Sequence, residues 1–415
     1  MDILRIATAG SVDDGKSTLI GRLMYETNSV TQDKLEAIER ASRRLGLEHV
    51  DLSLLTDGLI AEREQGITID VAHIYFSTPN RKYIIADTPG HFEYTRNMIT
   101  GASTAQVAII LIDARNGIVE QTYRHYYITQ LLRIPHVAVC INKMDLVNYS
   151  ENQFNSIRQE FRDLLGGREL PEQEITFIPV SSLYGENISK SSVEMSWYNG
   201  PFLLEYLENI EWHAGENHLP SRFPVQYVIR PKSEAFPDFR GFAGKVASGV
   251  FKAGDRVVAY PSMQESEIDH IYAYENPVDL AEAGQSAVIT LKDEIDLSRG
   301  DMLVRKETPV AAVKDLEARI CWLDSAPLRA GRNYLLQHGQ NRVKAKVTQL
   351  SHIVDIQNYN IIEGAEEIGL NQIGGISIKT AKPIFADQFR ENKHNGAFIL
   401  IDEGSNNTVG VGVVV

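Results

Sequence analysis

One segment near the N-terminus determines the architecture of this chain, and it reads Gly10-Ser11-Val12-Asp13-Asp14-Gly15-Lys16-Ser17-Thr18. It follows an apolar run that is typical of a strand, Ile3 to Ala7, and precedes a helix-like run, Leu19 to Tyr25. The pattern G-x-x-x-x-G-K-[ST] between a strand and a helix is a phosphate-binding loop, or P-loop. Its backbone N–H groups and the N-terminus of the helix form a cradle for anions. We therefore predict that all nine residues, Gly10 to Thr18, bind the phosphates of a nucleotide.

Two side chains of this loop carry specific roles. Lys16 supplies a positive charge to the β- and γ-phosphates, and the Ser17 hydroxyl can ligate Mg²⁺.

A second motif, Asp87-Thr88-Pro89-Gly90-His91, follows the run Tyr83 to Ala86, which is typical of a buried parallel strand. An Asp at the carboxyl end of such a strand can hold the Mg²⁺ shell through water. Gly90 allows a backbone N–H to approach the γ-phosphate closely. Taken alone, D-x-x-G is also the pattern of an Asx-type turn.

Two further motifs predict a site for guanine. Asn142-Lys143-Met144-Asp145 follows an apolar run, and the Asp carboxylate can accept hydrogen bonds from the N1–H and exocyclic amine of guanine. Adenine lacks this pair of donors and would leave a buried carboxylate unpaired. Ser181-Ser182-Leu183 follows the run Ile175 to Val180, and its backbone N–H groups can bind the guanine O6. The latter tripeptide alone is equally typical of an ordinary turn.

A fifth element, Gly66-Ile67-Thr68-Ile69, lies between the P-loop and Asp87. Thr68 can place its hydroxyl on Mg²⁺ and its N–H on the γ-phosphate, which would make the segment a switch that GTP orders. A Thr in an Ile-rich run is also compatible with a plain strand.

These motifs give the chain a resemblance to a known family. The segments Glu62 to Asp70 and Asp87 to His91 resemble the translation-factor superfamily of GTPases. Within it, Gly10 to Ser17 and Asp87 to Ala105 are similar to the large, GTP-binding subunits of bacterial sulfate adenylyltransferases. Elongation factors usually carry a His where this chain has Asp14 and an Arg where it has Gln65.

The resemblance implies a fold and an activity. It implies an α/β P-loop GTPase domain with a doubly wound, mostly parallel sheet, followed by two β-barrel domains of the translation-factor type. GTP would be hydrolysed with Lys16, Thr68 and His91 as catalytic residues, and His91 would orient the attacking water. Ser17 and Thr68 would ligate Mg²⁺ directly, and Asp87 would hold the ion through water. The partner implied is a smaller catalytic subunit that forms adenosine 5′-phosphosulfate, because this chain carries no second P-loop and no motif for adenylyl transfer.

Length and composition agree with several domains. The 415 residues suggest two or three domains, and we expect boundaries at 1–213, 222–308 and 309–415. The net charge of −14 argues against broad binding to nucleic acid. No apolar run is long enough to span a membrane, and no signal peptide is evident, so we expect a cytoplasmic protein with no membrane partner. Cys140 and Cys321 lie in apolar runs and are expected to be reduced core thiols.

Three points stay open at this stage. The segment Thr31 to Leu47 has the spacing of an amphipathic helix, which either packs or senses a partner. Arg63 is either a charge-stabilising residue or an ion-paired surface residue. Two other functions also remain possible, namely an elongation factor that carries aminoacyl-tRNA and a stand-alone signalling GTPase.

Overall fold

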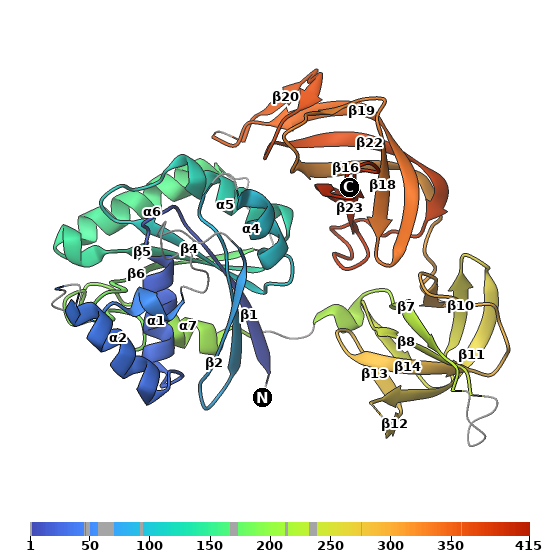
Figure 1. The fold of residues 1–415 in the computed structure, drawn as a ribbon, viewed down its shortest axis with the longest axis horizontal. Helices are drawn as coiled ribbons and strands as arrows, with labels where there is room; N and C mark the ends of the chain where they lie inside the picture. Colours follow the sequence, from blue (N-terminus) through green and yellow to red (C-terminus); the bar gives the residue numbers. More distant parts are fainter. Residues whose placement is uncertain are drawn as a thin grey trace. The chain divides into compact units, whose positions relative to one another are not determined.

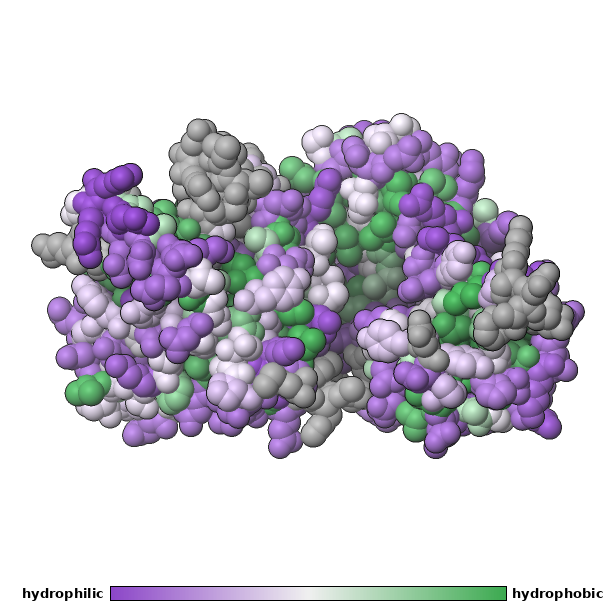
Figure 2. Space-filling model, turned by 60° about the horizontal axis from the view of Figure 1, so that its bottom comes forward, coloured by the Kyte–Doolittle hydropathy of each residue, from purple (hydrophilic) through white to green (hydrophobic). Residues whose placement is uncertain are grey.

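The computed structural model describes residues 2–44, 46, 50–56, 70–91, 94–166, 173–211, 215–231, 239–274, 276–357 and 359–415 (Figure 1). The chain divides into two compact units, residues 1–212 with 356–359 and residues 213–355 with 360–415. Among the described residues, no helix has both the length and the apolar character that crossing a bilayer requires. Hydrophilic side chains cover most of the face drawn in Figure 2, and hydrophobic side chains gather there in small patches.

The first unit is built on a six-stranded sheet in which only the edge strand β2 is antiparallel to its neighbour. The apolar runs of the sequence form its interior strands, and every residue of β4 is buried. This confirms the expected, mostly parallel sheet. In spatial order the strands are β2 (Ala72–Ser77), β3 (Lys82–Asp87), β1 (Ile3–Ala9), β4 (Val107–Asp113), β5 (His136–Asn142) and β6 (Glu174–Pro179).

Helices cover both faces of this sheet (Figure 1). On one face lie α1 and α7, and on the other lie α4, α5 and α6. The amphipathic pattern after the P-loop forms α2, which confirms a helix there. The bounds are α1 (Lys16–Glu26), α2 (Gln32–Arg44), η1 (Leu52–Leu55), α4 (Thr95–Ala102), α5 (Glu120–Leu131), η3 (Met144–Val147), α6 (Glu151–Leu165) and α7 (Leu203–Asn209).

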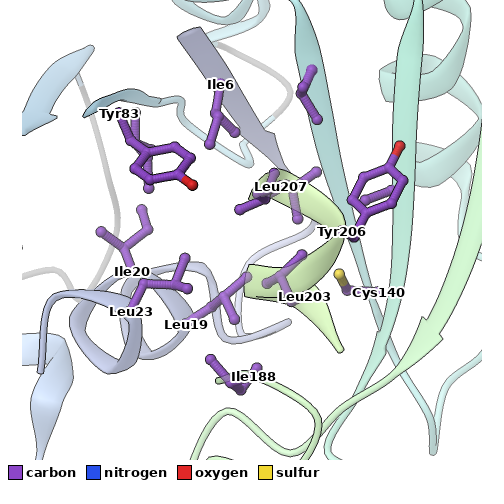
Figure 3. Close-up of a cluster of buried hydrophobic side chains, with 14 of the residues drawn as sticks. Ile6, Leu19, Ile20, Leu23, Tyr83, Cys140, Ile188, Leu203, Tyr206 and Leu207 are labelled. Carbon is purple, nitrogen blue, oxygen red and sulfur yellow. The ribbon is translucent and has the colours of Figure 1, made fainter. Parts of the chain in front are cut away.

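Helix α1 is fixed below the P-loop by a core that Figure 3 shows in close-up. Leu19 and Leu23 of α1 pack there with Leu203 and Leu207 of α7. Burying a side chain of this size stabilises a fold by about 1.5–3 kcal/mol. On another side of α1, a Cβ at Gly21 would lie 2.1 Å from the Leu52 carbonyl oxygen, so only glycine allows η1 to pack against the helix.

The second unit contains two closed barrels of six strands each. In the first, β10–β15–β7–β8–β14–β11 closes through the pairing of β10 with β11, and β12 extends the sheet. The bounds are β7 (Arg222–Ile229), β8 (Gly241–Lys245), β10 (Arg256–Tyr260), β11 (Gln264–Ala273), β12 (Asn276–Val278), β14 (Ser286–Leu291) and β15 (Met302–Arg305). A small ribbon pairs β9 (Val250–Lys252) with β13 (Leu280–Glu282), and the short helix η4 (Gly215–His218) precedes the barrel.

In the second barrel, β18–β23–β24–β16–β22–β19 closes through β18 and β19, and β20 extends it. The C-terminal apolar run forms β24, which pairs with β16 and β23. The expected closing strand is therefore confirmed. The bounds are β16 (Val313–Trp322), β18 (Asn333–His338), β19 (Asn341–Val354), β20 (Ile361–Glu363), β22 (Ile373–Ile384), β23 (Ala397–Ile401) and β24 (Thr408–Val414), and β17 (Leu328–Arg329) pairs with β21 (Glu367–Ile368).

The two barrels are joined by a buried ion pair. The Arg222 guanidinium, only 2% exposed, donates from Nε and one Nη to the two oxygens of Asp387, both at 2.9 Å. Its other Nη donates to the carbonyl oxygen of Thr308 at 2.7 Å. The amide groups of Asn392 and Asn395 also donate to Asp387. Because both charges have several partners, the ion pair can be buried without an unsatisfied group.

The two cysteines agree with their expected roles. Cys140 and Cys321 are free thiols and both are fully buried. Burial raises the pKa of Cys140 to about 12, so its thiol stays protonated.

Candidate nucleotide site

The P-loop connects β1 to α1, with Gly15 at φ 92° and Asp13 at φ 68°. The left-handed backbone at Gly15 is accessible to glycine without strain. Lys16 is 7% exposed, and its Nζ donates to the carbonyl oxygens of Gly10 at 2.7 Å and Ser11 at 2.8 Å. The ammonium is thus placed inside the loop.

Charge and burial compete at Lys16. Burial lowers the pKa of Lys16, whereas the negative charges of Asp87 and Asp14 oppose this shift. Burial also raises the pKa of Asp14, whose carboxylate accepts the Ser11 N–H. In this structure one N–H group of the loop is therefore bound by a side chain of the loop itself.

The segment Asp87–His91 lies directly against the P-loop. Asp87 is buried at the end of β3 and accepts a hydrogen bond from the Thr8 hydroxyl at 3.2 Å. A Cβ at Gly90 would lie 2.3 Å from the Gly10 carbonyl oxygen and 2.5 Å from the Lys16 Nζ. Only glycine therefore allows this segment to pack so closely against the P-loop, and the predicted approach of the Gly90 N–H to the γ-phosphate stays a prediction.

Its last residue, His91, is exposed. The imidazole lies with its centroid 6.0 Å from that of Tyr94. Thr88 and Pro89 are buried between Asp87 and Gly90.

Asn142 brings three of the predicted motifs together. Its side chain is 1% exposed and donates to the Asp14 carbonyl oxygen of the P-loop at 2.7 Å. Its amide oxygen accepts the Ser182 N–H at 3.0 Å and the Ser182 hydroxyl at 2.9 Å. One buried amide therefore links β5, the P-loop and the Ser181–Leu183 turn.

The other residues of the Asn142–Asp145 motif contact the P-loop or the Ser181–Leu183 turn, or are buried next to them. Lys143 has a left-handed backbone, and its Nζ donates to the Asp13 carbonyl oxygen and lies 3.0 Å from an oxygen of Asp113. Met144 is fully buried, and Asp145 accepts the Ser181 hydroxyl at 2.6 Å. The structure thus places the P-loop, the Asp87–His91 segment, the Asn142–Asp145 motif and the Ser181–Leu183 turn at the carboxyl ends of neighbouring strands, where ligands bind in α/β sheets.

Thr68, by contrast, lies outside the described residues, as do Gly66, Ile67, Ile69, Arg63 and Gln65. Their predicted roles stay predictions.

Two charged residues of the site gave no signal in the sequence. Asp113 at the end of β4 is 1% exposed, and its carboxylate binds Arg115 at 2.7 Å as well as Lys143. Burial alone would raise the pKa of Asp113, but hydrogen bonds from Arg115 and the charge of Lys143 lower it to about 2. Arg22 of α1 donates to the carbonyl oxygens of Ser182, at 3.1 Å, and Leu183, and so holds the turn in place.

The donor set can accommodate Mg²⁺ together with a nucleotide. No group of three or more His, Cys, Asp or Glu side chains forms a metal site within the described part of the chain. Mg²⁺ is usually held by one or two carboxylates together with phosphate oxygens and water, so a cluster of acids is not required. Ser17 is half-buried in the loop, and the Asp87 carboxylate lies close enough to Lys16 to affect its pKa, so both can offer an oxygen atom to the ion.

Comparison with known proteins identifies the class to which this fold and site belong. The family described as "Elongation factor Tu GTP binding domain" matches residues 1–219, and "GTP-eEF1A C-terminal domain-like" matches residues 315–415. The GTPase-like domain of Saccharomyces cerevisiae Ski7 has a similar fold, with a TM-score of 0.54, 17% identity and coverage of 100% of this chain and 97% of that one. The chain is a translation-factor-type GTPase with a guanine-nucleotide-binding domain.

Curated relatives place it more closely. Sulfate adenylyltransferase subunit 1 of Bacteroides fragilis is 47% identical, over 100% of this chain and 86% of the relative. The protein of the same name from Cronobacter sakazakii is 48% identical, over 99% and 86%. The bifunctional enzyme CysN/CysC of Mycobacterium tuberculosis is 45% identical, over 100% of this chain and 67% of that enzyme. The chain belongs to the sulfate adenylyltransferase subunit 1 family.

Proposed function

We propose that this chain is the cytoplasmic GTPase subunit of a heteromeric sulfate adenylyltransferase that acts in sulfate assimilation. In this proposal, GTP hydrolysis drives the formation of adenosine 5′-phosphosulfate from ATP and sulfate on a smaller partner subunit. The observation that supports it most is that Asn142 joins three of the predicted nucleotide motifs, in a chain that is similar over its whole length to proteins named subunit 1.

Phosphate binding would depend on the buried ammonium of Lys16. Its ammonium is held by the carbonyl oxygens of Gly10 and Ser11 and can exchange these for oxygens of the β- and γ-phosphates. The nine residues Gly10 to Thr18 would then form the cradle predicted from the sequence.

Selection of guanine would depend on Asp145. One of its carboxylate oxygens accepts the Ser181 hydroxyl, which fixes the orientation of the side chain. The carboxylate would accept the guanine N1–H and amine, while the turn Ser181–Leu183 would face O6. An adenine in the same place would leave the carboxylate unpaired, at a cost of about 1–3 kcal/mol or more for a charged group.

Hydrolysis requires a positioned water and charge stabilisation rather than covalent chemistry by the protein. Ser17, Thr68 and Asp87 would hold Mg²⁺, which neutralises charge on the phosphates. His91 would orient the attacking water by accepting a hydrogen bond from it. Its exposed position leaves the imidazole able to turn toward a bound nucleotide.

GTP hydrolysis on this chain and the reaction on the partner can be coupled through their binding equilibria. A reaction on another subunit is driven by GTP only if the GTP and GDP states bind the states of that subunit with different affinity. The partner would carry the adenylyl transfer, and this chain would supply the switch.

The proposal is tested by measuring GTP turnover of the purified chain, alone and with the smaller subunit, ATP and sulfate. We expect turnover to rise only when subunit, ATP and sulfate are all present, with matching formation of adenosine 5′-phosphosulfate. Turnover that ignores all three additions would contradict the proposal. Protection of aminoacyl-tRNA by the GTP form would then support an elongation factor.

A further inference from the structure

Lysine side chains gather on the outer surface of the second barrel of the second unit. On β19, Lys344 and Lys346 are exposed and alternate with the buried Ala345 and Val347, so both lysines point outward. On the neighbouring strand β22, Lys379 lies directly opposite Lys346 in the antiparallel register. Like charges directly opposite each other destabilise a sheet. On its other side Lys379 lies opposite Asp315 of β16, which offsets part of this repulsion.

These three lysines and Lys314 line a cavity of about 470 Å³. We call this cavity with its four lysines the lysine surface. One acidic residue, Glu403, lies in its lining. The whole chain carries a net charge of −14, so the lysine surface is a local reversal of the charge of the molecule.

Two ion pairs at this surface do little to neutralise its charge. Lys344 lies 3.6 Å from Glu403, with side chains 73% and 41% exposed. Lys379 lies 3.8 Å from Asp315, with side chains 63% and 77% exposed. Both distances are long for an ion pair, and exposed pairs contribute little. The positive charge is therefore available to a ligand.

We infer that the lysine surface docks an acidic segment of the partner subunit, an inference that rests on the proposed function. Complementary charge steers encounter between proteins and fixes their register. An occupying carboxylate would also relieve the repulsion between Lys346 and Lys379. The relatives named "subunit 1" imply that a second polypeptide is bound, and this surface has the chemistry to receive it.

A nucleic acid fits this surface less well. A long polyanion needs many cations along its path, and the chain as a whole has a net charge of −14. The lining contains no aromatic side chain on which bases could stack. A short acidic segment of a protein needs neither an extended basic track nor a stacking platform.

The test is a double charge reversal, Lys346→Glu with Lys379→Glu, in the full chain. The matched control reverses two exposed lysines of the first barrel, Lys245→Glu with Lys252→Glu. Binding of each variant to the purified smaller subunit is measured by calorimetry at several salt concentrations. A cooperative thermal unfolding transition and unchanged GTP binding, which takes place in the other unit, show that each variant is folded.

We expect the Lys346/Lys379 variant to bind the smaller subunit about tenfold more weakly at low salt, with a difference that shrinks as salt rises. The control should bind like the unaltered chain. Equal affinity of both variants would overturn the docking inference and leave the proposed function intact. Failure of the unaltered chain to bind the subunit would overturn the proposed function and the inference with it. Loss of duplex RNA binding, with subunit binding unchanged, would assign the surface to nucleic acid instead.

Discussion

Replacement of Asn142 by Ala tests how the nucleotide site is held together. The substitution removes one hydrogen bond to the Asp14 carbonyl oxygen and two from Ser182. The Ser182 hydroxyl can turn to another partner, but the Asp14 carbonyl and the Ser182 N–H are left buried. A buried group without a partner costs about 1–3 kcal/mol. We expect the two loops to lose about 2–4 kcal/mol of stability against local opening.

Hydrogen exchange followed by mass spectrometry measures this loss directly, because it does not require that the chain unfold in one step. A factor of ten in an equilibrium corresponds to about 1.4 kcal/mol. Peptides that cover Asp14 and Ser182 should therefore exchange roughly 30- to 1,000-fold faster in the variant. Ser182→Ala, which removes only the hydroxyl bond, should give a smaller acceleration of about tenfold or less.

The matched control is Asn155→Ala on α6, a half-buried asparagine that lies outside the site. Its exchange pattern around Asp14 and Ser182 should equal that of the unaltered chain. If Asn142→Ala leaves both peptides within threefold of the unaltered rates, Asn142 does not hold the loops, and the geometric basis of the site is wrong.

Four other substitutions test individual roles. Lys16→Ala should abolish binding of a fluorescent GTP analogue, and intact binding would contradict the phosphate cradle. Asp145→Asn should shift the preference from GTP toward xanthosine triphosphate in a competition assay. An unchanged preference would contradict the role of Asp145 in selecting guanine. His91→Ala should bind GTP nearly normally but hydrolyse it about ten- to a thousandfold more slowly in single-turnover assays, as expected when one positioning group is lost. The pKa of Asp113 is lower in the folded protein than the value of about 3.9 in the unfolded chain, so its ionised carboxylate stabilises the fold above that pH. This stability is lost as the pH falls from about 3.9 toward 2. In acid unfolding experiments, Asp113→Asn should therefore reduce the dependence of the free energy of unfolding on pH in that window.

The sequence predicted those parts of the site that nucleotide chemistry imposes. A phosphate requires backbone N–H groups and a cation, so Gly15 and Lys16 could be recognised from their spacing. The strands could be recognised as well, since long apolar runs such as that of β4 are typical of a parallel sheet. The role of His91 came from resemblance and that of Thr68 from its place between two motifs, and both stay predictions.

Other residues could not be predicted because tertiary contacts alone give them a role. Nothing in the sequence indicated that the Asn142 amide joins Asp14 of the P-loop to Ser182, and its predicted contact with the nucleotide stays a prediction. Arg22 lies on α1, far along the chain from the carbonyl groups that it binds in the Ser181–Leu183 turn. An arginine on a helix surface has no sequence signature for such a contact, which depends on where the chain returns 160 residues later.

The predicted boundary at 308/309 in the second unit lies at a tertiary contact that the sequence does not reveal. The sequence there shows only Thr308-Pro309, which is compatible with a short linker between barrels. In the structure, the carbonyl oxygens of Thr308 and Pro309 accept hydrogen bonds from Arg222, whose guanidinium also binds Asp387 of the other barrel. Removing one partner of a buried ion pair costs about 3–5 kcal/mol, since it leaves an uncompensated charge. The joint is therefore a packed and charge-satisfied part of one compact unit, and the boundary itself stays a prediction.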